Sequence, residues 1–193
     1  AASLLEIVGA EAPHHHLSLL PLATLLENIG GIYLPLLAGT TCVVPALEHV
    51  GLRGAAGLDT VRMVEALRRY QATSAIFIPQ MLQALVSALE QGAEPLGQLR
   101  FLAVGGAPVS PRLLARARVL GLPVHEGYGR SECASVVALN VPGRNLPGSV
   151  GRLLPHVRLR FAADGEIEVA GSQFRGYLGM PDASPDVFWP TGD

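Results

Sequence analysis

Short apolar runs alternate with longer segments of helical periodicity along the first two thirds of the chain. The apolar runs predict strands at residues 17–20, 41–44, 73–78, 101–104 and 124–126, each next to Pro or Gly. Strands that are apolar on both faces need cover on both sides of their sheet. The alternation therefore predicts a mostly parallel sheet flanked by helices.

Two of the helical segments carry their own start and stop signals. Asp59 is placed to cap a helix that runs to Tyr70, with apolar residues at every third or fourth position. Ser110, followed by Pro, is placed to cap a second helix that Gly121 ends. A third helix is expected over residues 80–91.

The last third of the chain changes to an alternation of period two. Residues 157–161 and 166–169 alternate apolar with charged side chains and predict a hairpin. A two-residue loop would place charged and apolar side chains on the same face, whereas a three-residue loop pairs Arg160 with Glu168 and keeps the faces consistent. We therefore expect the longer, bulged loop, with Gly165 in the left-handed conformation.

These patterns divide the chain into two parts of the α/β class. Residues 1–139 are expected to form the layered subdomain with the mostly parallel sheet. Residues 140–193 are expected to form a smaller antiparallel β region.

The amino-acid composition excludes several classes of function. All 14 basic residues of the 193 are arginine, so a Schiff-base, general-base or phosphate-binding lysine is excluded for this chain. A net charge of -2 argues against a nucleic-acid partner, and 49% hydrophobic residues argue against disorder. Cys42 and Cys133 have neither metal-ligand spacing nor the density of a disulfide scaffold, which favours a reducing, cytoplasmic location.

One uncharged run, residues 29–47, is long enough to span a bilayer. Pro35, Gly39 and Pro45 interrupt it, so a helix, a turn and a short strand are expected instead. Part of this run is a candidate exposed patch for acyl chains or for peripheral contact with the inner membrane.

The first cluster with candidate chemistry is Gly105, Gly106, Ala107 and Pro108, directly after a buried-type strand. Small residues at the carboxyl end of a parallel strand leave backbone exposed, and a flat ring can lie against it. A plain strand-to-helix turn explains the same residues equally well.

The second cluster also follows a strand. Tyr128 lies between Gly127 and Gly129, and Ser131 and Glu132 come directly after. The aromatic ring can stack, the hydroxyl can donate to an anion, and a lone carboxylate can hold Mg²⁺ together with substrate phosphates. The alternative is a turn with its carboxylates in solvent, and the segment does not match the dinucleotide fingerprint.

Two other features could suggest a functional site, but an ordinary structural role is expected for each. His14, His15 and His16 are expected to form an ordinary loop, because adjacent side chains on an extended segment point to opposite faces. Cys133 is expected to be a structural thiol.

These motifs resemble those of the adenylate-forming superfamily of acyl-CoA synthetases, luciferases and peptide-synthetase adenylation domains, and most resemble the bacterial long-chain fatty acid group. The Gly-Tyr-Gly-Arg-Ser-Glu segment at 127–132 resembles the family's Tyr-Gly-x-Thr-Glu motif. Further signatures follow the family's order at 105–108, 148–152, 165–169, 176–179 and 191–193.

The resemblance runs from about Leu19 to the last residue and implies an incomplete domain. The family's phosphate loop with its lysine would precede residue 1, and a carboxy-terminal domain with the adenylation lysine would follow Asp193. The chain is therefore expected to be a fragment of the large amino-terminal domain, inactive alone, whose partners include the missing segments of the same protein.

The resemblance also implies roles for individual residues. Tyr128 would stack on adenine, Ser131 would hydrogen-bond the α-phosphate, and Asp193 would accept hydrogen bonds from the ribose hydroxyls. Glu132 would ligate Mg²⁺. The backbone lining the nucleotide would come from Gly105, Gly106, Ala107, Gly127 and Gly129.

The implied reaction joins a carboxylic acid, a fatty acid in the first instance, to ATP, giving an acyl-adenylate and pyrophosphate. Coenzyme A then displaces AMP. Thr24 stands where the long-chain enzymes have a His. This departure from the family concerns the orientation of the acyl carboxylate. Two alternatives remain: a non-catalytic relative that binds a ligand or partner, and an adenylation enzyme for aryl or amino acids.

Overall fold

A seven-stranded mixed sheet forms the centre of the protein in a computed structural model, which describes residues 1–9, 14–54, 57–171, 173–179, 182, 184 and 187–193. Its strand order is β2-β1-β5-β6-β7-β8-β9, and the first five strands run parallel. The last two strands add antiparallel to β7. The strands are β1 His15–Leu17, β2 Thr41–Val43, β5 Ser74–Phe77, β6 Phe101–Val104, β7 Val124–Tyr128, β8 Ala138–Leu139 and β9 Arg152–Leu153.

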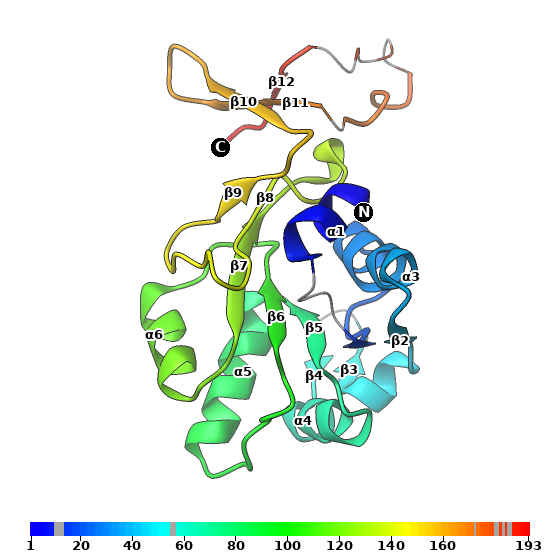
Figure 1. Cartoon of the computed structure of the whole chain (residues 1–193), viewed down its shortest axis with the longest axis vertical. Helices are drawn as coiled ribbons and strands as arrows, with labels where there is room; N and C mark the ends of the chain where they lie inside the picture. Colours follow the sequence, from blue (N-terminus) through cyan, green and yellow to red (C-terminus); the bar gives the residue numbers. More distant parts are fainter. Residues whose placement is uncertain (10–13, 55–56, 172, 180–181, 183, 185–186) are drawn as a thin grey trace.

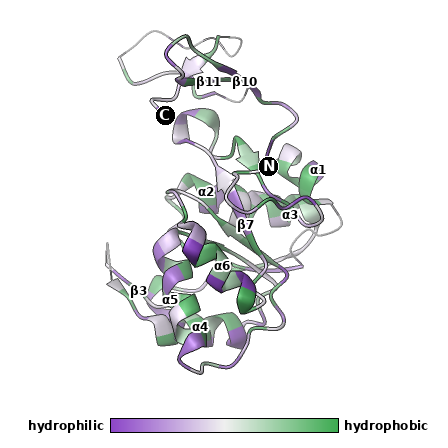
Figure 2. Cartoon of the chain, turned by 90° about the vertical axis from the view of Figure 1, so that its left-hand side faces the viewer, coloured by the Kyte–Doolittle hydropathy of each residue, from purple (hydrophilic) through white to green (hydrophobic). Residues whose placement is uncertain are grey.

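Helices cover both faces of this sheet (Figure 1). On one face α4 packs against α5 and α5 against α6, and Figure 2 shows that each carries both hydrophilic and hydrophobic residues. On the other face lie the amino-terminal helix and the helices between β1 and β2. The helical segments are α1 Ala2–Val8, α2 Leu25–Glu27, η2 Asn28–Tyr33, α3 Leu34–Ala38, η3 Leu47–Val50, α4 Thr60–Arg69, α5 Pro79–Glu90, α6 Pro111–Val119 and η4 Ser131–Cys133. A two-stranded ribbon, β3 Leu52–Arg53 and β4 Gly57–Leu58, precedes α4.

Two apolar clusters pack against the two faces. Leu102 and Val104 of β6 belong to the cluster under α4, α5 and α6. Phe101, on the opposite face of the same strand, belongs to the cluster with α1, α3 and the later strands. Side chains alternate between faces along a strand, so a strand that is apolar throughout supplies both clusters. The sequence-based prediction of a mostly parallel sheet with cover on both sides is confirmed.

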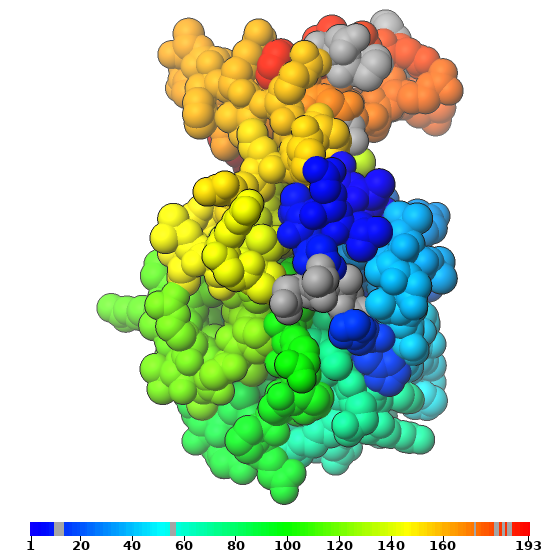
Figure 3. All heavy atoms as spheres, viewed as in Figure 1, coloured from blue at the N-terminus to red at the C-terminus, as the bar shows by residue number. Residues whose placement is uncertain are grey.

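A second, three-stranded antiparallel sheet lies at one end of the molecule (Figures 1 and 3). It contains β10 Arg158–Phe161, β11 Ile167–Ala170 and β12 Trp189–Pro190. Arg160 pairs with Glu168 in the hairpin, and Gly165 has a φ of 95°. The predicted register and the left-handed glycine are both confirmed. The division at residues 139 and 140 stays a prediction.

The helix predictions hold with one correction. Asp59 caps α4 and accepts a hydrogen bond from the backbone N–H of Arg62 at 3.2 Å. Ser110 stands at the N-cap of α6, but its side chain makes no capping hydrogen bond. Pro111, at the first helical position, has no N–H, so the first turn has one fewer backbone donor to satisfy.

The first strand was predicted wrongly. It spans His15–Leu17 rather than 17–20, so His15 and His16 are strand residues and not part of a loop, whereas His14 lies just before the strand. His16 pairs in register with Ser74 on the neighbouring strand and is only 2% exposed. Because a strand with buried polar residues lacks an apolar run, the hydrophobic pattern placed this strand too far along the chain.

The uncharged run at 29–47 is broken as expected. It contains η2, α3, a left-handed turn at Gly39 and β2. Within the described ranges, no helix is both long enough and apolar enough to cross a bilayer.

Candidate functional site

A cavity of about 450 Å³ lies at the carboxyl ends of β6 and β7. Most of the residues singled out from the sequence line it. They are Thr24, Gly105, Gly106, Gly127, Tyr128, Gly129, Ser131 and Glu132. Two others, Ala107 and Asp193, do not line it, although Asp193 contacts Tyr128 at its edge. Ligands of open α/β sheets bind at this edge, where backbone groups point outward.

The first glycine cluster provides a backbone wall of this cavity. The N–H of Gly105 donates to the carbonyl of Phe77 at 3.2 Å, which fixes the turn after β6. Gly106 has a φ of 83°, a conformation that favours glycine. Ala107, next in the chain, is exposed. The segment is therefore a strand-to-helix turn and a cavity wall at once.

The second cluster depends on a close crossing of two chain segments. A Cβ built on Gly129 would lie 1.5 Å from the carbonyl oxygen of Ser135, so only glycine fits. The loop turns back through Ala134 and Ser135, whose φ angles of 53° and 78° are left-handed. Such a conformation is costly for residues with a Cβ, and it is found preferentially at functional sites. The crossing holds Ser131 and Glu132 beside the cavity.

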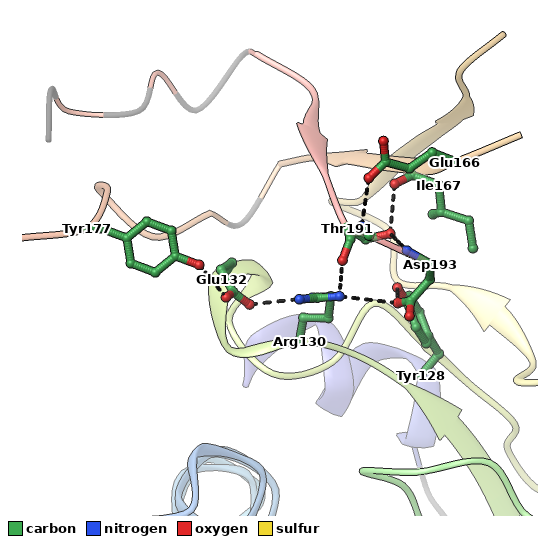
Figure 4. A network of polar contacts seen from close by, with 9 residues as sticks. Tyr128, Arg130, Glu132, Glu166, Ile167, Tyr177, Thr191 and Asp193 are labelled. Carbon is green, nitrogen blue, oxygen red and sulfur yellow. Dashed lines mark hydrogen bonds and ion pairs between the residues drawn. The ribbon is translucent and has the colours of Figure 1, made fainter. Parts of the chain in front are cut away.

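A polar network joins this loop to the small sheet (Figure 4). The hydroxyl of Tyr128 donates to Oδ2 of Asp193 at 2.5 Å. The guanidinium of Arg130 donates to the carbonyl of Thr191 and lies 3.5 Å from the same carboxylate oxygen. Burial, and then the hydrogen bond to Asp193, raise the pKa of Tyr128, so its hydroxyl keeps its proton.

Glu132 is held from two sides. The hydroxyl of Tyr177 donates to its Oε1 at 2.7 Å, and Arg130 lies 3.6 Å from its Oε2. The Tyr177 hydrogen bond is the largest influence lowering the pKa of Glu132, which keeps this carboxyl charged. Mg²⁺ takes one or two carboxylates together with substrate phosphates, and a charged Glu132 at the cavity fits that donor set. No group of three or more His, Cys, Asp or Glu gathers in the described segments to hold a metal without other ligands.

The other end of the cavity is apolar. Leu20, Leu25, Leu26, Ile78 and Val136 are among its lining residues. Thr24 lies between these residues, at the N-cap of α2, and its hydroxyl makes no capping hydrogen bond. The cavity therefore combines a polar region around the loop 127–132 with an apolar region around α2.

Sequence reasoning missed a network of buried polar side chains close to the apolar part of the cavity. The ring of His16 lies 3.2 Å from Oε1 of Glu27 through Nε2 and 2.9 Å from the hydroxyl of Ser74 through Nδ1. Glu27 also accepts from the N–H of Leu20 at 3.3 Å. Glu27, Ser74 and His16 are 0%, 1% and 2% exposed. This network holds α2 in place. The sequence signal for it was Glu27, a single charged residue within an otherwise uncharged segment.

Neither cysteine is placed as a nucleophile. Cys133 is buried, and that burial raises the pKa of its thiol, as expected of a structural residue. Burial, with the nearby charge of Glu27, raises the pKa of Cys42 to about 11, and its thiol donates to the carbonyl of Gly31.

Comparison with known proteins gives one family. The model of the AMP-binding enzyme family matches residues 3–178. A long-chain fatty acid CoA ligase of Thermus thermophilus is 30% identical over 165 residues, covering 70% of this chain and 30% of that protein. Long-chain fatty acid CoA ligase 6 of Homo sapiens is 37% identical over 109 residues, covering 50% of this chain and 16% of that protein. The chain thus spans less than a third of these relatives.

Solved structures agree on the fold. An o-succinylbenzoate CoA synthetase from Bacillus subtilis superposes with a TM-score of 0.78 at 21% identity, covering all of this chain and 40% of that one. The same synthetase has been solved with AMP and with ATP and a magnesium ion.

Proposed function

The chain belongs to the AMP-binding enzyme family, and on that premise we propose that its cavity binds the adenine nucleotide of an ATP-dependent acid–thiol ligase. One observation carries the proposal. Tyr128, Ser131 and Glu132 lie on a single loop at the carboxyl edge of the sheet, and the side chain of Asp193 lies within 2.5 Å of Tyr128. An aromatic ring, a hydroxyl and one carboxylate on the cavity, with a second carboxylate at its edge, suit adenine, phosphate, metal and ribose in turn.

The proposed roles follow from what each group can do chemically. Tyr128 stacks on adenine over a floor of backbone from Gly105 and Gly106. The hydroxyl of Ser131 donates to the α-phosphate. Asp193 accepts hydrogen bonds from the ribose hydroxyls with the same carboxylate that accepts from the Tyr128 hydroxyl.

Glu132 is the proposed ligand of Mg²⁺. When bound, the ion neutralises the charge that develops on the phosphates. The hydrogen bond from Tyr177 keeps the carboxyl ionised and limits its rotation. Arg130, in ion-pair distance of both Glu132 and Asp193, supplies positive charge on the same side of the cavity.

For the whole protein, we propose the reaction of the family's CoA ligases. A carboxylate oxygen attacks the α-phosphorus of ATP, and pyrophosphate leaves. The sulfur of coenzyme A then attacks the acyl carbon, AMP leaves, and the thiol proton passes to solvent. This chain contributes positioning and charge, which lower the barrier by holding the reactants together and by stabilising developing charge.

We propose a fatty acid as the acid substrate. The apolar end of the cavity, with Leu20, Leu25 and Leu26, offers no charged side chain to a substrate. The curated relatives named above are long-chain fatty acid CoA ligases. An aryl acid is the second candidate, because the synthetase with the similar fold acts on o-succinylbenzoate.

Calorimetry of this chain with AMP and with ATP tests the nucleotide site. We expect binding that Tyr128→Ala weakens by roughly tenfold or more, since base stacking on an aromatic ring contributes about 1–3 kcal/mol. Tyr33→Ala is the matched control, because Tyr33 is exposed and lies outside the cavity. Absence of binding at millimolar nucleotide would refute the site.

Pyrophosphate release by the whole protein, measured across fatty acids of increasing length and aryl acids, separates the two substrate classes.

A further inference from the structure

Among the described residues that line the cavity at the carboxyl edge of the sheet, one side chain is a cation. That residue is Arg130, and the charged residue beside it on the same lining is Glu132. The chain contains no lysine. A phosphate monoester carries about two negative charges near neutral pH. A phosphate that enters this cavity therefore meets the guanidinium of Arg130 as the positive charge of the described lining.

The backbone of Arg130 is fixed where the loop 127–132 turns back on itself. Its carbonyl accepts the N–H of Cys133 at 3.1 Å and that of Ser135 at 3.0 Å. Arg130 is also the N-cap residue of η4, with an extended backbone. Its side chain therefore projects from a fixed point. The side chain is 36% exposed, so a ligand can reach it.

The guanidinium lies between the two carboxylates that the proposed site assigns to metal and to ribose (Figure 4). Its Nε is 3.6 Å from Oε2 of Glu132, and its Nη1 is 3.5 Å from Oδ2 of Asp193. Nη1 also donates to the carbonyl of Thr191. A guanidinium carries its N–H donors in a planar fork, which matches the oxygens of a phosphate.

A nucleotide in the proposed orientation places its α-phosphate in the same interval. The α-phosphate is bonded to the ribose, which Asp193 holds in the proposed site, and it lies next to the metal, which Glu132 holds. Ser131, the proposed donor to this phosphate, follows Arg130 directly in the chain. Carboxylates repel a phosphate and a hydroxyl gives it one donor, whereas a guanidinium gives it charge and paired donors.

We propose that the guanidinium of Arg130 binds the α-phosphate of the nucleotide. This role rests on the proposed nucleotide site. Arg130 stands at the position that the Tyr-Gly-x-Thr-Glu motif leaves open, so the contact is a property of this chain and not of the motif. Without a nucleotide, Glu132 and Asp193 keep the guanidinium in the interval, and the phosphate binds a side chain that is already in position.

Calorimetry of the chain with AMP and with adenosine, both without Mg²⁺, tests this role. The two ligands share their base and ribose, so an effect of Arg130 that acts through Asp193 is the same for both. The ratio of the two affinities therefore isolates the phosphate. We expect the unchanged chain to bind AMP more tightly than adenosine by about tenfold or more, and Arg130→Gln to lower this ratio by about tenfold, because hydrogen bonds between charged groups are the stronger class.

Two further variants separate charge at this position from charge elsewhere. Arg130→Lys keeps the positive charge and is expected to retain most of the preference for AMP. Arg175→Gln is the matched control, because Arg175 is exposed and does not line the cavity, and it should leave the ratio unchanged. A ratio in Arg130→Gln equal to that of the unchanged chain, or to that of Arg130→Lys, would overturn the proposal.

The unchanged chain also gives a test that needs no variant. If it bound AMP and adenosine with equal affinity, the role of Arg130 would be refuted while the nucleotide site stood. If it bound neither ligand, the nucleotide site itself would be refuted, and the role of Arg130 with it.

Discussion

The hydroxyl of Tyr128 donates a 2.5 Å hydrogen bond to Oδ2 of Asp193, 65 positions further along the chain. Tyr128 ends β7 of the large sheet, and Asp193 follows the last strand of the small sheet. Arg130 strengthens the junction through the carbonyl of Thr191. The position of the small sheet and the shape of the cavity beside Tyr128 are therefore coupled through one carboxylate.

This contact predicts opposite effects for two substitutions. Tyr128→Phe keeps the stacking ring and frees Asp193, so we expect AMP to bind as well as in the unchanged chain or up to about fivefold more tightly. Asp193→Ala removes the acceptor for the ribose and is expected to weaken AMP by about tenfold. Calorimetry with AMP measures both. If Tyr128→Phe weakened AMP as much as Asp193→Ala, the phenol and the ribose would not compete.

Gly129 is expected to tolerate no side chain. A Cβ there would lie 1.5 Å from the carbonyl oxygen of Ser135, and backbone cannot move aside as a side chain does. We expect Gly129→Ala to lower the free energy of unfolding by about 3 kcal/mol or more, at the upper end for overpacking. Gly97→Ala is the control, because its Cβ would meet nothing within 4 Å. Urea unfolding of both variants gives the comparison, and similar midpoints would contradict the crossing.

The predictable parts of the fold are those with a local signal. The hairpin register followed from Arg160 and Glu168, because a slip by one residue would have moved charged side chains to the apolar face. The cap at Asp59 followed from the apolar period after it. For the cavity, both glycine clusters were found because each directly follows a strand, and ligands of open α/β sheets bind at the carboxyl ends of strands.

The parts that were missed depend on contacts between distant residues. His16 is a strand residue because Ser74 and Glu27 satisfy its ring in the core, and neither partner is visible from its neighbours in the chain. The hydrogen bond from Tyr177 to Glu132 likewise joins residues 45 positions apart. Local patterns mark apolar burial well, and they do not mark polar groups that are buried in pairs.

The buried pair of His16 and Glu27 is expected to matter strongly for stability. Glu27 is 0% exposed, and its removal would leave the His16 ring and the N–H of Leu20 without an acceptor. We expect Glu27→Ala to cost about 1–3 kcal/mol in the free energy of unfolding for each buried group that is left without a partner.

The exposed pair of Arg116 and Glu90 offers the control for that substitution. Glu90→Ala removes a carboxylate of the same type from the surface, where water replaces the lost partner. Its urea midpoint is expected to stay close to that of the unchanged chain. A loss of stability in Glu27→Ala no greater than in Glu90→Ala would show that the buried pair is not structural.

Tyr177 is expected to set the pH range over which Glu132 is charged. Its hydroxyl lowers the pKa of Glu132, so the folded carboxyl stays ionised at pH values where the unfolded one binds a proton. The stability from this contact is present above the unfolded pKa and is lost as the pH falls through the lower, folded pKa. Tyr177→Phe should raise the pKa of Glu132, seen by carboxyl ¹³C NMR, and should move the acid limit of magnesium binding to higher pH. Glu90, whose pKa is lowered by Arg116, should titrate alike in both proteins. If Glu132 also titrated alike in both, another group would be holding its charge.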